Sequence, residues 1–87
     1  MAPLPLSAVF EGDFVGLLVA VDDQDSVAVV GQKIAHHVVG RRIPARAAPV
    51  GVRYDGRVLD PDRPIGEYGL GLLDHVEAFF DEQGVRR

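Results

Sequence analysis

Three histidines, His36, His37 and His75, are the side chains best suited to bind a transition metal or transfer protons near neutral pH. His36 and His37 are adjacent, and neighbouring residues of an α-helix point about 100° apart. The pair therefore cannot chelate one ion from a regular helix. The apolar pattern around them places His37 on the buried side, so we expect a packed or hydrogen-bonded imidazole there rather than a metal ligand.

Carboxylates gather just before the histidines, in the segment DDQDS at residues 22–26. Asp22, Asp23 and Asp25 are spaced somewhat as in a calcium-binding loop. The glycine and the distal bidentate glutamate of such a loop are missing at the required offsets. We interpret the segment as a solvated turn before a helix, in which Asp25 or Ser26 caps the first turn.

Nucleophilic chemistry finds little support. Ser7 and Ser26 are the only serines, and the chain has neither threonine nor cysteine. Neither serine lies in a G-x-S-x-G or P-loop pattern. An enzyme needs positioned acids, bases, nucleophiles or a metal, so we expect no catalytic, metal-binding or cofactor-binding residue in this chain.

Arginine supplies the last candidate chemistry. Arg41, Arg42 and Arg46 form a small basic cluster. They are either solvated loop residues or a bidentate grip on the carboxylates of another protein. The sequence leaves both interpretations open.

One helix positions most of these groups. The segment 25–42 has an apolar stripe at spacings of three and four residues, which predicts an amphipathic helix. Gly40 is expected to end it in a left-handed turn. The predicted buried face consists of Val27, Val30, Ile34, His37 and Val38.

Alternating or apolar runs predict five strands, at residues 6–10, 14–21, 50–54, 57–59 and 75–80. Asp55–Gly56 is a strong two-residue hairpin signal between the third and fourth strands. The first and last strands are apolar enough to lie centrally, and a parallel pairing between them is plausible. Within the turn-rich segment 60–71, we expect inward side chains at Ile65, Tyr68 and Leu70.

The second predicted strand is apolar on both faces. Val15, Leu17, Val19 and Val21 would point one way, whereas Phe14, Leu18 and Ala20 would point the other way. A one-sided sheet normally alternates with polar residues. Either another part of this chain covers the second face, or another protein does.

The totals limit the classes of function. A chain of 87 residues is one domain, with a core expected at about residues 4–82 and a polar tail at 83–87. The net charge of −4 argues against nucleic acid. The longest apolar run is too short to span a bilayer, so we expect no membrane association. The absence of cysteine suits a cytoplasmic protein.

The order of two strands, one helix, two strands, a turn and a last strand predicts an α+β fold. The passage from Val52 to Phe80 resembles the second half of ubiquitin-like β-grasp domains. Arg53 replaces the isoleucine of ubiquitin's recognition patch, and Gly84 is followed by three residues rather than forming a terminal diglycine. The resemblance therefore does not favour a conjugated modifier or a receptor for ubiquitin's partners.

A closer resemblance covers residues 4–82. The segments AVFEGDF, VAVDDQDSV, QKIAHHVVGRRI, PDRPIGEYGL and VEAFFDE resemble, in order and spacing, the small gamma subunit of toluene monooxygenase hydroxylases. These are bacterial multicomponent enzymes with a carboxylate-bridged di-iron centre.

The resemblance implies a non-catalytic structural subunit. It implies a hydroxylase that is a dimer of three-chain protomers, with the di-iron centre in the alpha subunit and a beta subunit beside it. A ferredoxin, a reductase and an effector protein would complete an NADH-dependent system that inserts one oxygen atom of O2 into an aromatic or alkene hydrocarbon. The alternative is a free-standing ubiquitin-like adaptor or modifier.

For the subunit interpretation, we expect the partner interface to include residues from the second strand and the basic cluster. These residues are Phe14, Leu18, Ala20, Arg41, Arg42 and Arg46.

Overall fold

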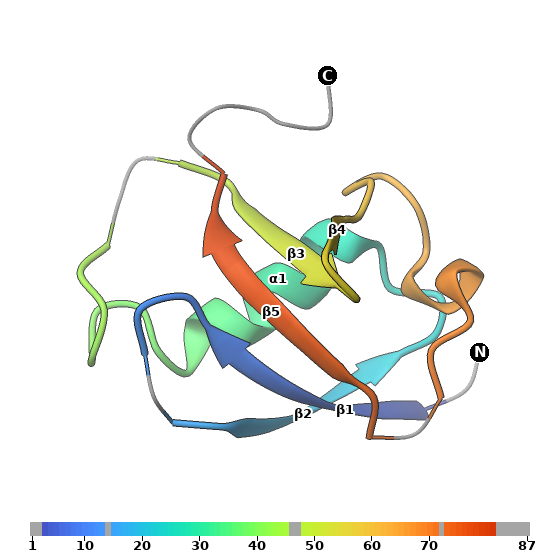
Figure 1. Cartoon of the computed structure of the whole chain (residues 1–87), viewed down its shortest axis with the longest axis horizontal. Coiled ribbons are helices and arrows are strands. Elements are labelled where there is room, and N and C mark those ends of the chain that lie inside the picture. The colour runs from blue at the N-terminus through green and yellow to red at the C-terminus, as the bar shows by residue number, and fades with distance from the viewer. Residues whose placement is uncertain (1–2, 14, 46–47, 72, 82–87) are drawn as a thin grey trace.

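The computed structural model describes residues 3–13, 15–45, 48–71 and 73–81. It contains five strands in one sheet, an α-helix that crosses the sheet, and a short 3-10 helix (Figure 1). The elements are β1 (Pro3–Phe10), β2 (Leu17–Asp22), α1 (Val27–His36), β3 (Val50–Tyr54), β4 (Arg57–Val58), η1 (Ile65–Tyr68) and β5 (His75–Phe80).

The strand order is β2-β1-β5-β3-β4, with β1 and β5 parallel and every other pair antiparallel. This topology confirms the predicted mixed sheet and the central parallel pair. The predicted hairpin is also confirmed, because Asp55 and Gly56 have φ values of 53° and 77°, as a type I′ turn requires.

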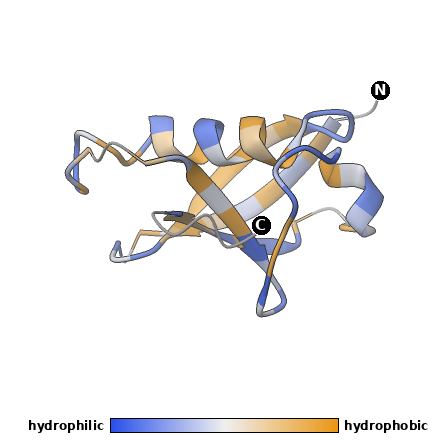
Figure 2. Ribbon diagram, turned by 90° about the horizontal axis from the view of Figure 1, so that it is seen from above, coloured by the Kyte–Doolittle hydropathy of each residue, from blue (hydrophilic) through white to orange (hydrophobic). Residues whose placement is uncertain are grey.

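The core lies between α1 and the sheet face beneath it (Figure 2). Even-numbered residues of β1 alternate inward with a period of two, and Leu6, Ala8 and Phe10 are almost fully buried. Val27, Val30, Ile34 and Val38 meet them from the helical segment, as predicted. Ile65 and Leu70 are buried and Tyr68 packs against the core, which confirms the three predicted anchors.

The end of the helix differs from the prediction. The helix stops at His36, whereas the sequence pattern had continued to Gly40. His37 is the C-cap, and its side chain is exposed rather than on the buried face. The chain turns out of the helical path after His37, so that Val38 fills the buried position; Gly40 then adopts the expected positive φ, at 81°.

The second strand also begins later than predicted. It starts at Leu17 rather than Phe14, because the connection from β1 includes a turn at Glu11–Gly12 and runs to Gly16. Val15 lies in this connection and is 45% exposed, so the prediction that it points with Val19 and Val21 is wrong.

A glycine in the middle of α1 sets the distance between the helix and β3. A Cβ atom at Gly31 would lie 3.0 Å from the carbonyl oxygen of Val50 and 3.1 Å from its Cγ1. Glycine is unfavourable inside a helix by about 1 kcal/mol. The close approach of the two backbones accounts for its presence here.

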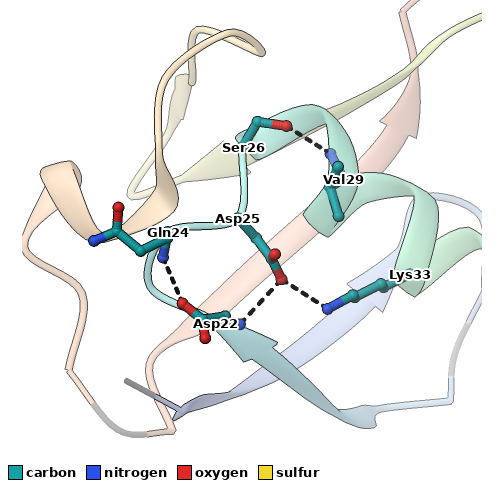
Figure 3. Close-up of polar contacts among 6 residues, drawn as sticks. All are labelled: Asp22, Gln24, Asp25, Ser26, Val29 and Lys33. Carbon is teal, nitrogen blue, oxygen red and sulfur yellow. Dashed lines mark hydrogen bonds and ion pairs between the residues drawn. The ribbon is translucent and has the colours of Figure 1, made fainter. Parts of the chain in front are cut away.

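The start of α1 is held by a small polar network (Figure 3). Ser26 is the N-cap, and its Oγ accepts the backbone N–H of Val29 at 3.2 Å. The Asp25 carboxylate accepts the backbone N–H of Asp22 at 3.0 Å and the Lys33 ammonium at 2.7 Å. The Asp22 amide, followed by the Lys33 ammonium, lowers the pKa of Asp25 below its ordinary value of 3.8.

We expect Gly31→Val to lower the free energy of unfolding by about 1–3 kcal/mol, because the added atoms separate α1 from β3. Gln32→Val is the matched control. It places the same side chain at the next, exposed position of the helix, and should cost less than about 1 kcal/mol. Urea denaturation measures both changes. Equal losses would contradict the close-packing explanation.

Asp25 should make the free energy of unfolding depend on pH in the acidic range. Its folded-state pKa is lowered, so its contribution is complete above about pH 4 and is lost as the pH falls through the folded-state value. Asp25→Asn should therefore destabilise the protein at pH 7, and the difference from wild type should shrink below pH 4. Ser26→Ala removes a cap without a titrating group and should cost about 1 kcal/mol at both pH values. Denaturation curves at pH 7 and pH 3 test this; an Asp25→Asn difference that stays constant refutes it.

Candidate partner interface

The sheet has an outer face, defined here as the face away from α1, and part of it is apolar and open. Leu18 of β2 points outward and is 70% exposed, and Ala20, two residues further along the strand, is also exposed. Their neighbours Val19 and Val21 point inward and are buried. The sequence allowed two interpretations of this strand, in which its second face is covered either by this chain or by another protein. At Leu18 and Ala20 the structure shows no cover from within the described chain.

β2 is also an edge strand, since it pairs with β1 alone (Figure 1). An edge strand presents unpaired backbone groups, which monomeric proteins usually protect with charge, proline or a bulge. Residues 15–21, VGLLVAV, contain no charged residue and no proline. The opposite edge, β4, is only two residues long and presents the exposed Arg57. Among the strands that the structure describes, β2 is therefore the edge that lacks a protecting charge or proline over residues 17–21.

The basic cluster is partly used within the chain. Arg42 Nε donates to Asp13 Oδ2 at 2.9 Å, and the Asp13 side chain is only 7% exposed. This ion pair ties the chain after α1 to the turn that leads into β2, where Ile43 also lies against Gly12. Arg41 is exposed and forms no ion pair within the described residues. Arg41 is therefore the freer of the two cations for a partner.

The structure separates the predicted interface residues into two groups. Leu18 and Ala20 lie on the outer face, whereas Arg41 and Arg42 follow the helix on the other side of the sheet, at the end where β2 begins. A partner could contact both groups only by lying along the β2 border. Phe14 and Arg46 are outside the described residues.

The other half of the outer face is charged, and the contacts that form it were not predicted from the sequence. Arg53 of β3 pairs with Glu77 of β5 and lies 3.8 Å from Glu11. Its guanidinium sits 4.5 Å from the centroid of the Phe79 ring, a cation–π contact. Phe79, only 5% exposed, covers Gly51 so closely that a Cβ there would lie 2.7 Å from the ring.

A signal for this arrangement was present in the sequence. A glycine inside a strand marks a place where another group approaches the backbone closely, and Gly51 pairs with Phe79 in the register of β3 and β5. Predicting the pairing required knowledge of that register. Because the Arg53 guanidinium packs on the Phe79 ring, this part of the outer face does not depend on a partner to cover its aromatic side chain.

A pocket of about 290 Å³ opens beside the charged residues and is lined by Val9, Arg53, Asp55, Gly56, His75 and Glu77. Ser7 Oγ lies 3.0 Å from His75 Nδ1 at its rim. A nucleophilic pair would need a carboxylate to orient the imidazole and donors for an oxyanion, and no described carboxylate hydrogen-bonds to His75. The arrangement does not constitute a catalytic triad.

Three further observations concern other kinds of site. The charge of Asp74, with some burial and a hydrogen bond of 3.2 Å, raises the pKa of Tyr54. In the described part of the chain, no group of three His, Cys, Asp or Glu side chains could hold a metal ion. No helix among the described residues is long and apolar enough to cross a bilayer.

Comparisons with known proteins show the family of this chain. The family described as toluene-4-monooxygenase system protein B matches residues 3–80. The chain belongs to this family. It is 38% identical over 84 residues to the gamma subunit of the toluene-4-monooxygenase hydroxylase of Ectopseudomonas mendocina, covering 94% of this chain and 100% of that one.

Two further similarities extend the comparison. The chain is 44% identical over 62 residues to an alkene monooxygenase gamma subunit of Xanthobacter autotrophicus, covering 69% of this chain and 70% of that one. A chain of the toluene 4-monooxygenase HD complex with 4-bromobenzoate superposes with a TM-score of 0.86, at 34% identity, covering 92% of this chain and 100% of that one.

The fold itself is ubiquitin-like. Ubiquitin of Caldiarchaeum subterraneum superposes with a TM-score of 0.69 at 17% identity, covering 95% of this chain and 99% of that one. This likeness confirms the predicted β-grasp fold, and the family match confirms the resemblance inferred from the sequence.

The internal pair Asp13–Arg42 should be visible in stability. Arg42→Glu should lower the free energy of unfolding by about 1–2 kcal/mol, because it places a second carboxylate beside the largely buried Asp13. Arg41→Glu makes the same substitution at the preceding residue, which is exposed, and should lower the free energy of unfolding by less than about 0.5 kcal/mol. Urea denaturation of the isolated chain compares them. If the two variants lose the same stability, Arg42 is not a structural residue.

Proposed function

We propose that this chain is the small gamma subunit of a di-iron hydroxylase that inserts one atom of O2 into aromatic or alkene hydrocarbons. The observation that carries the proposal is the match over 94% of the chain to the gamma subunit of a toluene-4-monooxygenase hydroxylase, joined by a match over 69% of the chain to an alkene monooxygenase gamma subunit. Its role is structural: it assembles with, and stabilises, the subunits that carry out the chemistry.

The chemistry of the chain supports a non-catalytic role. A carboxylate-bridged di-iron centre needs several Glu, Asp and His side chains converging on one point. The described residues provide no such group. We therefore assign the irons to the large alpha subunit, and derive no reaction step from the residues of this chain.

The proposal includes the rest of the system. The partners would be the alpha and beta subunits, in a dimer of three-chain protomers, with an effector protein, a ferredoxin and an NADH-dependent reductase acting on the assembled cytoplasmic enzyme. The net charge of −4 agrees with a protein partner rather than nucleic acid.

The proposed interface lies along β2. Leu18 and Ala20 would supply its apolar part, and Arg41 would supply a cation for a carboxylate of the partner. Arg42 would act chiefly by holding the neighbouring turn through Asp13. Phe14 and Arg46 remain part of the proposed interface on the basis of the sequence alone.

Co-expression with the other hydroxylase subunits tests the function. A tag on this chain should recover a large complex with about two irons per alpha chain, which native mass spectrometry and iron analysis can measure. Recovery of the chain alone, from cells that actively oxidise hydrocarbon, would contradict the proposal and favour the free-standing adaptor.

Two matched substitutions locate the interface within that experiment. Leu18→Asp should lower recovery of the complex about tenfold or more, because it places a charge in an apolar contact. Val29→Asp makes the same kind of change at an apolar residue that is 37% exposed on α1, on the other side of the sheet. Its recovery should match wild type. If Val29→Asp disrupts the complex and Leu18→Asp does not, the interface lies on the helix.

A further inference from the structure

The backbone of β2 has a free edge whose hydrogen-bonding groups can be identified from the sheet register. The N–H of Ser7 donates to Asp74 and that of Glu11 donates to Ala78, at 3.0 and 2.8 Å. Odd-numbered residues of β1 therefore face β5, and even-numbered residues face β2.

The same reasoning assigns β2. The even-numbered residues of β1 lie opposite Leu17, Val19 and Val21, whose N–H and C=O groups consequently point toward β1. Leu18 and Ala20 alternate with them, so their N–H and C=O groups point away from the sheet. Two donors and two acceptors are thus aligned along the border where the Leu18 side chain is also exposed.

The free edge has a defined length. At one end, the outward N–H of Asp22 is occupied, because the Asp25 carboxylate accepts it at 3.0 Å (Figure 3). At the other end, a Cβ at Gly16 would meet nothing within 4 Å, so the approach is open. The available edge runs from Gly16 to Ala20, which accommodates a strand of about five residues, or roughly 17 Å.

We propose that an extended segment of a larger hydroxylase subunit adds to this edge as a sixth strand, paired with the backbone of Leu18 and Ala20. This inference rests on the proposed function. An extended backbone offers donors and acceptors in matching alternation, so it can pair with all of these groups at once. Residues 15–21 contain no charge and no proline that would protect the edge, as expected of an edge that a partner covers in the working enzyme.

The size of the edge favours a larger subunit over a second copy of this chain. A pairing of about five residues buries far less than the roughly 1,200 Å² of a stable interface. The occupant must therefore add further contacts. A large subunit that also covers Leu18 and reaches Arg41 supplies them, whereas two copies joined through this edge alone do not.

Proline at the outward position provides the test. Ala20→Pro removes an N–H that faces the free edge and leaves the hydrogen bonds between β1 and β2 in place. It should weaken retention of the chain in the assembled hydroxylase about tenfold, the effect of losing one or two hydrogen bonds. Ala20→Ser keeps the N–H and should change retention less than about threefold. Competition between tagged wild-type and variant chains for the complex measures both.

Hydrogen exchange supplies a second measurement that needs no variant and decides the matter if Ala20→Pro fails to fold. Peptides containing the amides of Leu18 and Ala20 should exchange rapidly in the isolated chain and become at least about tenfold slower in the complex, because each new hydrogen bond must open before exchange.

Each other outcome overturns the inference in a distinguishable way. A complex that forms while these amides exchange as in the free chain removes the strand addition and leaves the proposed function intact. Wild-type chain that does not assemble at all removes both. Protection in the isolated chain, together with a dimer mass, shows that a second copy occupies the edge.

Discussion

A single helix can cover only one face of a sheet, and the rest of this structure depends on that constraint. Burial of α1 against β1, β5 and β3 uses the apolar stripe of Val27, Val30, Ile34 and Val38. The outer face must then be stabilised without a second layer. The two halves of the outer face differ in this respect, and the difference explains why one half is a candidate interface.

On the β3–β5 half, the outer face is closed by its own side chains. Phe79 lies on Gly51, Arg53 lies on Phe79, and Glu77 pairs with Arg53. On the β2 half, Leu18 remains exposed beside a free backbone edge. Asp13, in the turn leading to that edge, pairs with Arg42 of the segment that follows α1.

Local patterns predicted much of this architecture. The 3.6-residue period located α1, Asp55–Gly56 located the β3–β4 hairpin, and the resemblance to a known family fixed the topology. The failures came from contacts between distant residues. His37 continues the apolar period, but it is the C-cap at which the helix ends, and its side chain is exposed. Arg42 looked like a free cation because its partner Asp13 is 29 residues away. Phe79 and Gly51 become neighbours only through the β3–β5 register.

The central claim is that the β2 border of this subunit is covered in the working enzyme. An experimental structure of the assembled hydroxylase containing this chain tests that claim most directly. The account predicts that Leu18 and the β2 edge are buried against another subunit, while the exposed side of α1 and the charged half of the outer face around Arg53 and Glu77 stay outside that contact. An assembly in which β2 stays exposed and the chain docks through its helix would contradict it.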